Sequence, residues 1–307
     1  MEYTEHKAYA KINWILNVLG KRPDGYHEVE TLMQAVDLSD RIRTGWELCP
    51  AGLPPYAFPC EEFPGELSVE VRTDSPLLPA GPENLAYRAA VLMHERFHSG
   101  LRERITLDIE KSIPIAAGLA GGSADGAAVL WALAGMWAPE GEAFGDLLEL
   151  AALLGSDVPF CLMVHKGVTA CLATGRGTEL QPVEPLDCKL LITTPDLPVS
   201  TRDVYGELKE EDCLERYDVE AFLSRVPLDL AKGAALAGNH LQAPALRLFP
   251  QIRKSIDWVR SLHDPLAVFM SGSGPSVVGV YPWGSPMESI CVCHGLNPSN
   301  HFVSTLK

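Results

Sequence analysis

Residues 114–125 read Pro-Ile-Ala-Ala-Gly-Leu-Ala-Gly-Gly-Ser-Ala-Asp. This run of small residues lies between a predicted strand at 105–109 and a strongly apolar stretch at 127–134, which predicts a buried helix. Small side chains leave the backbone N–H groups open to a ligand, and a helix start adds unpaired N–H groups and the positive end of its dipole. The combination favours binding of an anion, most often phosphate. The alternative is a turn of small residues packed against neighbouring backbone.

The composition is that of a globular protein with room for two domains or one large one. The chain has 307 residues, of which 47% are hydrophobic and 21% charged. Its 25 basic and 40 acidic residues give a net charge of −15, which argues against non-specific binding to nucleic acid or to an anionic membrane. An acidic protein must therefore attract a phosphate ester locally, with backbone dipoles, a few cations and a metal ion.

The sequence predicts a cytoplasmic protein with reduced thiols. It has no apolar run long enough to span a membrane, and its first residues resemble neither a secretory nor a transit signal. The eight cysteines form no Cys-x-x-Cys pair, so we expect free thiols. Cys291-Val292-Cys293-His294 fits no common zinc spacing, and we expect no metal site there.

Residues 8–18 alternate between apolar and mixed positions with a period of two, which predicts a half-buried strand. On this pattern Lys11 and Asn13 share one face and point away from the core. A turn around Pro23-Asp24-Gly25 follows, and then a second extended region at 29–40.

The rest of the chain mixes strands and helices without a regular βαβ rhythm, which favours an α+β fold over a doubly wound one. A loop is predicted at 50–65, which holds five prolines. The predicted strands are 67–71, a hairpin at 167–183 around Gly175-Arg176-Gly177, 188–194, and a pair within 266–281. The predicted helices are 84–98, about 143–154, and most of 203–260.

The glycine-rich loop is neither a Walker A motif nor a Rossmann fingerprint, because it lacks the Gly-Lys-Ser/Thr ending of the first and the spacing of the second. The pattern from Pro114 to Ala124 resembles the central phosphate loop of the GHMP kinase superfamily. Three further segments resemble the branch of that superfamily that phosphorylates cytidine diphosphate methylerythritol. They are Ala10-Lys11-Ile12-Asn13 with Arg22-Pro23-Asp24-Gly25-Tyr26-His27, then Gly155-Ser156-Asp157-Val158-Pro159-Phe160, and Met270-Ser271-Gly272-Ser273-Gly274. The likeness covers most of residues 8–281.

The resemblance implies a two-domain α+β GHMP kinase fold. Its N-terminal domain, residues 1–165, would resemble domain 2 of ribosomal protein S5, and its C-terminal domain, residues 166–307, would be a ferredoxin-like sandwich. The active site would lie in the cleft between them. ATP with Mg²⁺ would be the co-substrate, and cytidine diphosphate methylerythritol the acceptor. We expect a monomer or a weak homodimer that binds neither nucleic acid nor membrane.

The resemblance also implies an ATP site. It would consist of Asn84, Pro114, Ala116, Ala117, Gly118, Leu119, Ala120, Gly121, Gly122, Ser123 and Ala124. The loop would hold the triphosphate through its N–H groups, with Ser123 near the phosphates or Mg²⁺, and Asn84 would help to line the adenine pocket. An Asn that caps a helix start is an equally good interpretation of Asn84.

The resemblance implies that Lys11 and Asp157 are catalytic. Asp157 would orient and deprotonate the accepting hydroxyl, and its predicted place at a helix start would keep it ionised. Lys11 would neutralise charge on the transferring phosphoryl group. Without the resemblance, Asp157 would be interpreted as an ordinary N-cap residue and Lys11 as a solvated lysine.

The acceptor site implied by the resemblance combines aromatic and small residues. It would consist of Asn13, Tyr26, His27, Asp157, Tyr205, Gly272, Ser273 and Gly274. Tyr26 can stack on a cytosine ring, His27 can bond its edge, and Tyr205 would close the other side. Core packing is the alternative for a single Tyr.

Two residues depart from the family pattern. Ala120 stands where Gly is common, and Gly126 stands where Ala is usual. We expect altered ATP affinity with retained chemistry. Two other functions stay open: a mevalonate-type or homoserine kinase, which would not need a base-binding pair, and a catalytically silent nucleotide-binding protein, which should have lost Lys11 or Asp157.

Overall fold

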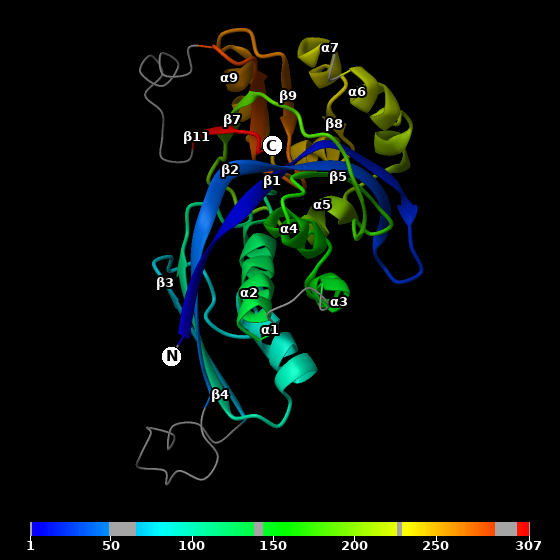
Figure 1. Cartoon of the computed structure of the whole chain (residues 1–307). Coiled ribbons are helices and arrows are strands. Elements are labelled where there is room, and N and C mark those ends of the chain that lie inside the picture. The colour runs from blue at the N-terminus through cyan, green and yellow to red at the C-terminus, as the bar shows by residue number, and fades with distance from the viewer. Residues whose placement is uncertain (1, 49–65, 138–143, 226–228, 286–299, 307) are drawn as a thin grey trace. The chain divides into compact units, whose positions relative to one another are not determined.

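The computed structural model describes residues 2–48, 66–137, 144–225, 229–285 and 300–306 (Figure 1). The predicted loop at 50–65 and the Cys291–His294 segment lie outside these residues. The chain divides into two compact units. Unit 1 is Met1–Ala8, Ser39–Ile115 and Gly121–Lys166, and unit 2 is Tyr9–Leu38, Ala116–Ala120 and Gly167–Lys307. The units are not contiguous in sequence, so they differ from domains divided at 165/166, which remain a prediction.

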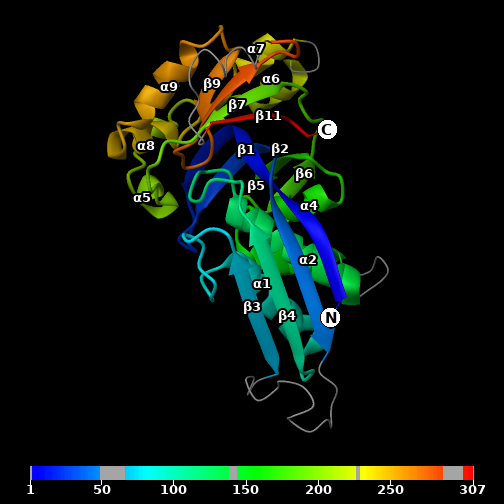
Figure 2. The same ribbon diagram turned by 90° about the vertical axis from the view of Figure 1, so that its left-hand side faces the viewer.

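In its described residues, unit 1 combines paired strands with a group of helices. The second half of strand β2 pairs with β4 in antiparallel register, Arg41 opposite Glu110 and Leu48 opposite Glu103. Strand β3 lies beside β4 in parallel (Figure 2). The elements are β2 (His27–Leu48), β3 (Leu67–Thr73), β4 (Glu103–Glu110), α1 (Leu85–Met93), α2 (Gly121–Trp137), α3 (Phe144–Leu154) and α4 (Val158–His165).

Helix α2 is the central helix of unit 1, because α1, α3 and α4 all pack on it. The predicted buried helix at 127–134 is confirmed, and it begins at Gly121. The predicted helix at 84–98 is also confirmed, although its last turn, His94–His98, has π-helical hydrogen bonding. The predicted helix near 143–154 ends at Leu154, just before Gly155.

Unit 2 contains an antiparallel sheet in the order β11-β7-β10-β9. The predicted hairpin is confirmed as β5 and β6, and it pairs with the first half of β2 through Thr31–Gln34. Strand β1 (Glu2–Lys21) belongs to unit 1 up to Ala8 and to unit 2 from Tyr9. The other elements of unit 2 are β5 (Ala170–Thr174), β6 (Glu179–Pro182), β7 (Lys189–Thr193), α5 (Thr201–Gly206), the 3-10 turn Glu210–Cys213, α6 (Val219–Arg225), α7 (Leu230–Ala234), β8 (Gly238–Asn239), α8 (Gln242–Leu248), α9 (Ile252–Arg260), β9 (Ala267–Met270), β10 (Val277–Tyr281) and β11 (Asn300–Ser304).

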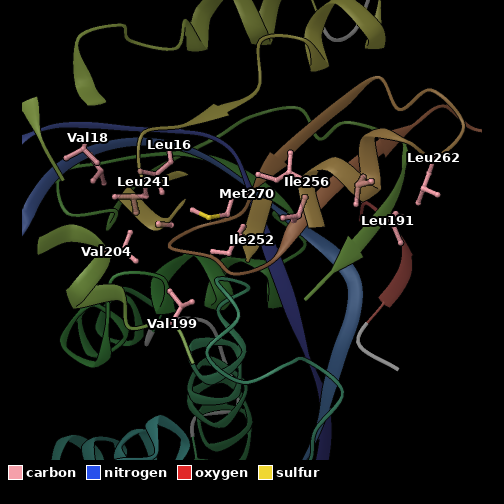
Figure 3. Packing of buried hydrophobic residues seen from close by; sticks show 14 of the residues in the cluster. Leu16, Val18, Leu191, Val199, Val204, Leu241, Ile252, Ile256, Leu262 and Met270 are labelled. Atoms are coloured by element: carbon pink, nitrogen blue, oxygen red, sulfur yellow. The ribbon is translucent and has the colours of Figure 1, made fainter. Parts of the chain in front are cut away.

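The core of unit 2 lies where α9 packs on β9 and β10 (Figure 3). Ile252, Ile256 and Val259 are buried there, at the spacing of one helix face. Leu191 from β7 and Met270 from β9 belong to the same cluster. This packing fixes the end of β9, from which the Ser271–Gly274 turn starts.

The predicted half-buried character of residues 8–18 is wrong. Every residue from Ala10 to Val18 is buried, on both faces of β1. Lys11 and Asn13 do share a face, as predicted, but they have only 3% and 2% of their surface exposed. That face is covered by residues of the 116–120 loop and by Ser271, which hydrogen-bond to it.

The described elements confirm the α+β class. No helix in the described part of the chain is both long and apolar enough to cross a membrane. Of the eight cysteines, the four at described positions (161, 171, 188 and 213) form no disulfide with one another.

Candidate active site

The loop between Ile113 and Gly121 has its carbonyl groups turned toward the protein. Three consecutive carbonyls accept hydrogen bonds within unit 2. Ser276 N–H donates to Ala117 O at 3.3 Å, and Ser271 Oγ donates to Gly118 O at 3.2 Å. Lys11 N–H donates to Leu119 O at 3.1 Å. The N–H groups of Ala116 and of residues 118–120 donate to no acceptor in the described residues, whereas Ala117 closes a turn that begins at Pro114. The N–H groups without such an acceptor are therefore available to an anion.

The backbone of this loop alternates in handedness. Ala116, Gly118 and Ala120 have φ values of 54°, 74° and 60°, whereas Ala117 and Leu119 between them do not have positive φ. Successive residues of opposite hand turn their N–H groups toward one concave side, which suits an anion. Ala120, the departure from the family pattern, thus adopts a left-handed conformation that costs an L-residue about 1–2 kcal/mol.

Gly118 packs directly on the Ser271–Gly274 turn, and both sides of this contact are backbone. A Cβ at Gly118 would lie 2.3 Å from Ser271 O and 3.0 Å from Gly274 N, and a Cβ at Gly272 would lie 2.8 Å from Gly118 O. The predicted phosphate loop and the predicted C-terminal glycine motif are therefore in direct backbone contact.

We expect Gly118→Ala to lower the free energy of unfolding by about 2 kcal/mol or more, because it combines a left-handed alanine with overpacking against backbone. It should also raise the KM for ATP. Chemical denaturation and steady-state kinetics measure the two effects. The matched control is Gly135→Ala, where no heavy atom other than those of its chain neighbours and its own helix backbone lies within 4 Å of the new Cβ; it should leave the KM unchanged. Wild-type stability and KM in Gly118→Ala would contradict the packing argument.

A chain of side-chain hydrogen bonds orients Lys11. Lys11 Nζ donates to Asn13 Oδ1 at 2.8 Å, and Asn13 Nδ2 donates to Thr31 Oγ1 at 2.8 Å. Thr31 Oγ1 in turn donates to Ile15 O at 2.7 Å. Since Thr31 uses its proton on Ile15, it accepts from Asn13, and this fixes the Asn13 amide with its oxygen toward Lys11. The Lys11 ammonium is held against the loop, where Gly118 O lies 3.5 Å away.

The Ser271–Gly274 turn is held by Asn239, a residue that the sequence analysis missed. Asn239 Nδ2 donates to Met270 O at 2.8 Å and to Gly272 O at 2.7 Å. Ser273 Oγ and Thr201 Oγ1 lie 2.8 Å apart. A lone Asn far from any motif carries no sequence signal for this role.

The residues predicted to bind the cytosine base make two separate ring contacts. His27 and Tyr205 stack on each other, with ring centroids 4.8 Å apart and planes inclined by 26°. Burial and the nearby Lys21 lower the pKa of His27, which favours the neutral form of its ring. Tyr26 is half exposed, and the guanidinium carbon of Arg176 lies 5.2 Å from its ring centroid.

Asn84 caps helix α1, as one of its two interpretations predicted. Its Oδ1 accepts the Ala86 N–H at 2.8 Å, and its Nδ2 donates to Pro79 O at 2.8 Å. A part in the adenine pocket stays a prediction. Gly121, Gly122, Ser123 and Ala124 form the first turn of α2, where Gly122 is exposed and Ser123 is half-buried.

Asp157 lies at the N-cap of α4, as predicted, but its side chain makes no cap hydrogen bond. The interpretation of Asp157 as an ordinary N-cap residue therefore does not explain why a carboxylate stands at this position. Lys11 belongs to unit 2 and Asp157 to unit 1. Their joint catalytic role stays a prediction.

Unit 1 also contains a buried ion cluster that the sequence analysis missed, formed by Asp40, Lys111 and Asp125. Asp125 directly follows the phosphate-loop motif, which is the one signal that could have drawn attention to it. Among the described residues, no group of three His, Cys, Asp or Glu side chains is arranged to hold a metal ion.

The chain is similar in sequence to known proteins. Residues 84–165 match the GHMP kinases N terminal domain, and residues 219–288 match the GHMP kinases C terminal domain. The 4-diphosphocytidyl-2-C-methyl-D-erythritol kinase of Geobacillus thermodenitrificans (strain NG80-2) is 40% identical over 286 residues, covering 92% of this chain and 90% of the relative.

Solved structures lead to the same family. A crystal structure of 4-(cytidine 5'-diphospho)-2C-methyl-D-erythritol kinase superposes with a TM-score of 0.75 at 31% identity, covering 99% of this chain and all of that one. The L. major mevalonate kinase, at a TM-score of 0.68 and 12% identity over 98% of this chain and 95% of that one, shares the fold alone. The predicted GHMP kinase fold is thereby confirmed. The chain belongs to the 4-diphosphocytidyl-2-C-methyl-D-erythritol kinases, a family within the GHMP kinases.

Proposed function

We propose that this protein transfers the γ-phosphoryl group of ATP to the 2-hydroxyl of 4-diphosphocytidyl-2-C-methyl-D-erythritol, which yields the 2-phosphate and ADP. The observation that carries the proposal is the loop whose three carbonyls, at residues 117–119, are bonded to protein while most of its N–H groups stay available. Such a loop suits a triphosphate. The names of the relatives supply the acceptor.

ATP would be held mainly by backbone. The N–H groups of Ala116, of residues 118–120 and of the first turn of α2 would bind the phosphates, and the α2 dipole would favour their negative charge. Mg²⁺ suits this site as part of Mg·ATP, because that ion takes its ligands chiefly from phosphates and water. The Ser123 hydroxyl at the start of α2 offers one oxygen ligand, and bound Mg²⁺ would neutralise phosphate charge.

Catalysis would rest on Asp157 and Lys11. Asp157 would accept the proton of the 2-hydroxyl while the new O–P bond forms. The bond between the γ-phosphorus and the bridging oxygen would break, and ADP would leave with the electron pair. Lys11 would stabilise the charge on the transferring group. Direct transfer without a covalent enzyme intermediate predicts inversion at phosphorus.

Recognition of the acceptor would rest on its cytosine ring. His27 and Tyr205 supply flat faces, and the neutral imidazole of His27 can donate and accept hydrogen bonds at the base edge. Tyr26 is exposed enough to present its ring to a ligand. Mevalonate and homoserine have no base and would not use these rings.

We expect Tyr205→Ala to raise the KM for the acceptor about 5-fold to 150-fold, since stacking on a base contributes about 1–3 kcal/mol. The KM for ATP should stay within a factor of about two, and Tyr205→Phe, which keeps the ring, should behave as wild type. Steady-state kinetics with each substrate varied in turn measures this. Equal losses of affinity for ATP and acceptor would exclude a base-stacking role.

The function itself is tested by a coupled assay of ADP release across three acceptors: the cytidine diphosphate compound, mevalonate and homoserine. We expect turnover with the first compound alone. Preference for mevalonate or homoserine would refute the acceptor assignment, and ATP binding without any phosphoryl transfer would favour a silent nucleotide-binding protein.

A further inference from the structure

A buried ion cluster lies at the base of the phosphate loop, and the reaction described above leaves it without a role. Lys111 Nζ donates to Asp40 Oδ2 and, at 2.8 Å, to Asp125 Oδ2. The three side chains are 7%, 0% and 1% exposed, respectively. Buried charges persist only when they are well paired. This cluster therefore holds its members in defined positions.

The cluster connects both ends of the loop. Asp40 Oδ1 accepts the N–H groups of Ser112 at 2.6 Å and Ile113 at 2.8 Å, the last two residues before Pro114. Asp125 lies one turn into α2, directly after the last residue of the phosphate-loop motif. Lys111 joins the two carboxylates, so one ammonium group ties the start of the loop to the helix that ends it.

Gly121 shows how close Lys111 comes to the start of this helix. A Cβ there would lie 3.4 Å from Lys111 Nζ and 3.0 Å from Ile113 Cγ2. A cation alone is unfavourable at the N-terminus of a helix. The two carboxylates offset this cost, which explains why a lysine can lie beneath an anion-binding turn.

The charge state of the cluster depends on its burial and on the interactions between its three charged groups. Burial would lower the pKa of Lys111, but the carboxylates of Asp125 and Asp40 outweigh it and raise that pKa. Burial, opposed by Lys111 and reinforced by Asp40, raises the pKa of Asp125 to about 7. Asp125 Oδ1 accepts no hydrogen bond in the described part of the chain. Asp125 can thus neutralise itself by taking up a proton if the cation is removed.

We propose that Lys111, held by Asp40 and Asp125, is a positioning residue for ATP: it fixes the two ends of the phosphate loop so that its N–H groups converge on the triphosphate. This inference rests on the proposed function. Lys111 touches neither substrate in this scheme. Its effect on ATP passes through the backbone at 112–113 and through the first turns of α2.

The test is Lys111→Met, together with the double variant Lys111→Met/Asp125→Asn, in which no buried carboxyl at 125 can ionise. We expect both to raise the KM for ATP about 10-fold to 100-fold, because a misplacement of about 1 Å caused by a distant mutation can cost about 10²-fold. The KM for the acceptor should stay within about twofold. A merely structural role would lower stability without this split between the substrates.

The matched control is Glu103→Gln, which alters another fully buried carboxylate of unit 1. Glu103 binds His94 at 2.6 Å and His98 at 2.8 Å. We expect this variant to lose stability in urea but to keep both KM values. An equal rise in the KM for ATP in Glu103→Gln, an unchanged KM in the Lys111 variants, or failure of both of those variants to fold would overturn the proposal. Absence of kinase activity in the wild type would instead refute the proposed function.

Discussion

Asp157→Asn is expected to lower kcat by about 10²-fold to 10⁴-fold, the contribution of a general base in proton transfer. The carboxylate side chain makes no cap hydrogen bond at the start of α4, so its replacement removes no helix cap. Asparagine is itself a good N-cap residue and nearly the same size. The loss should therefore appear in kcat, with little change in either KM or in the free energy of unfolding.

Asp229→Asn is the matched control, because Asp229 is also an N-cap aspartate, at the start of α7, where its side chain accepts the Lys232 N–H. It should leave kcat unchanged. Single-turnover kinetics with saturating ATP and acceptor separates chemistry from product release. Near-normal phosphoryl transfer by Asp157→Asn would remove this residue from the proton-transfer step.

Lys11→Met is expected to lower kcat by about 10²-fold to 10³-fold, as when one preorganised charge-stabilising donor is lost. Lys11 is buried, and the directed hydrogen-bond chain through Asn13 and Thr31 holds its ammonium group in place. Methionine keeps the apolar stem and removes the charge, so packing in β1 should be retained. The expected signature is a fall in kcat that exceeds any rise in the KM for ATP.

Lys254→Met serves as the control for net charge, because Lys254 is exposed on α9 in the same unit. It should change neither kcat nor KM. A second comparison is Asn13→Ala, which keeps Lys11 but removes its 2.8 Å partner; kcat should fall by less than in Lys11→Met. A larger loss in Asn13→Ala would mean that the orientation of β1, and not the Lys11 charge, governs the rate.

Much of the fold could be predicted from local sequence patterns. The helix that ends before Gly155, the hairpin around Gly175-Arg176-Gly177 and the paired strands within 266–281 all form as predicted. These patterns depend on hydrophobic periodicity and turn residues, which act over a few positions. Likewise the capping role of Asn84 could be predicted from its place just before a helix.

The burial of Lys11 and Asn13 could not be predicted in this way. Alternation along 8–18 shows only that one face is apolar; it does not show what covers the other. Here the cover comes from Gly118 and Ser271, which are 107 and 258 residues away from their partners on β1. Polar side chains were therefore buried against polar partners, a pairing that hydrophobic periodicity does not detect.

Local sequence patterns were enough to predict most of the helices and strands, the small-residue loop and, through the resemblance, the kinase family. Two features became visible only in the folded chain: Gly118 contacts the Ser271–Gly274 backbone and so leaves no room for a side chain, and Asp40, Lys111 and Asp125 form one buried cluster. The difference lies in the range over which the interactions act. Helix and turn preferences are set by neighbouring residues, whereas close backbone contacts and buried ion pairs exist only after distant segments have come together.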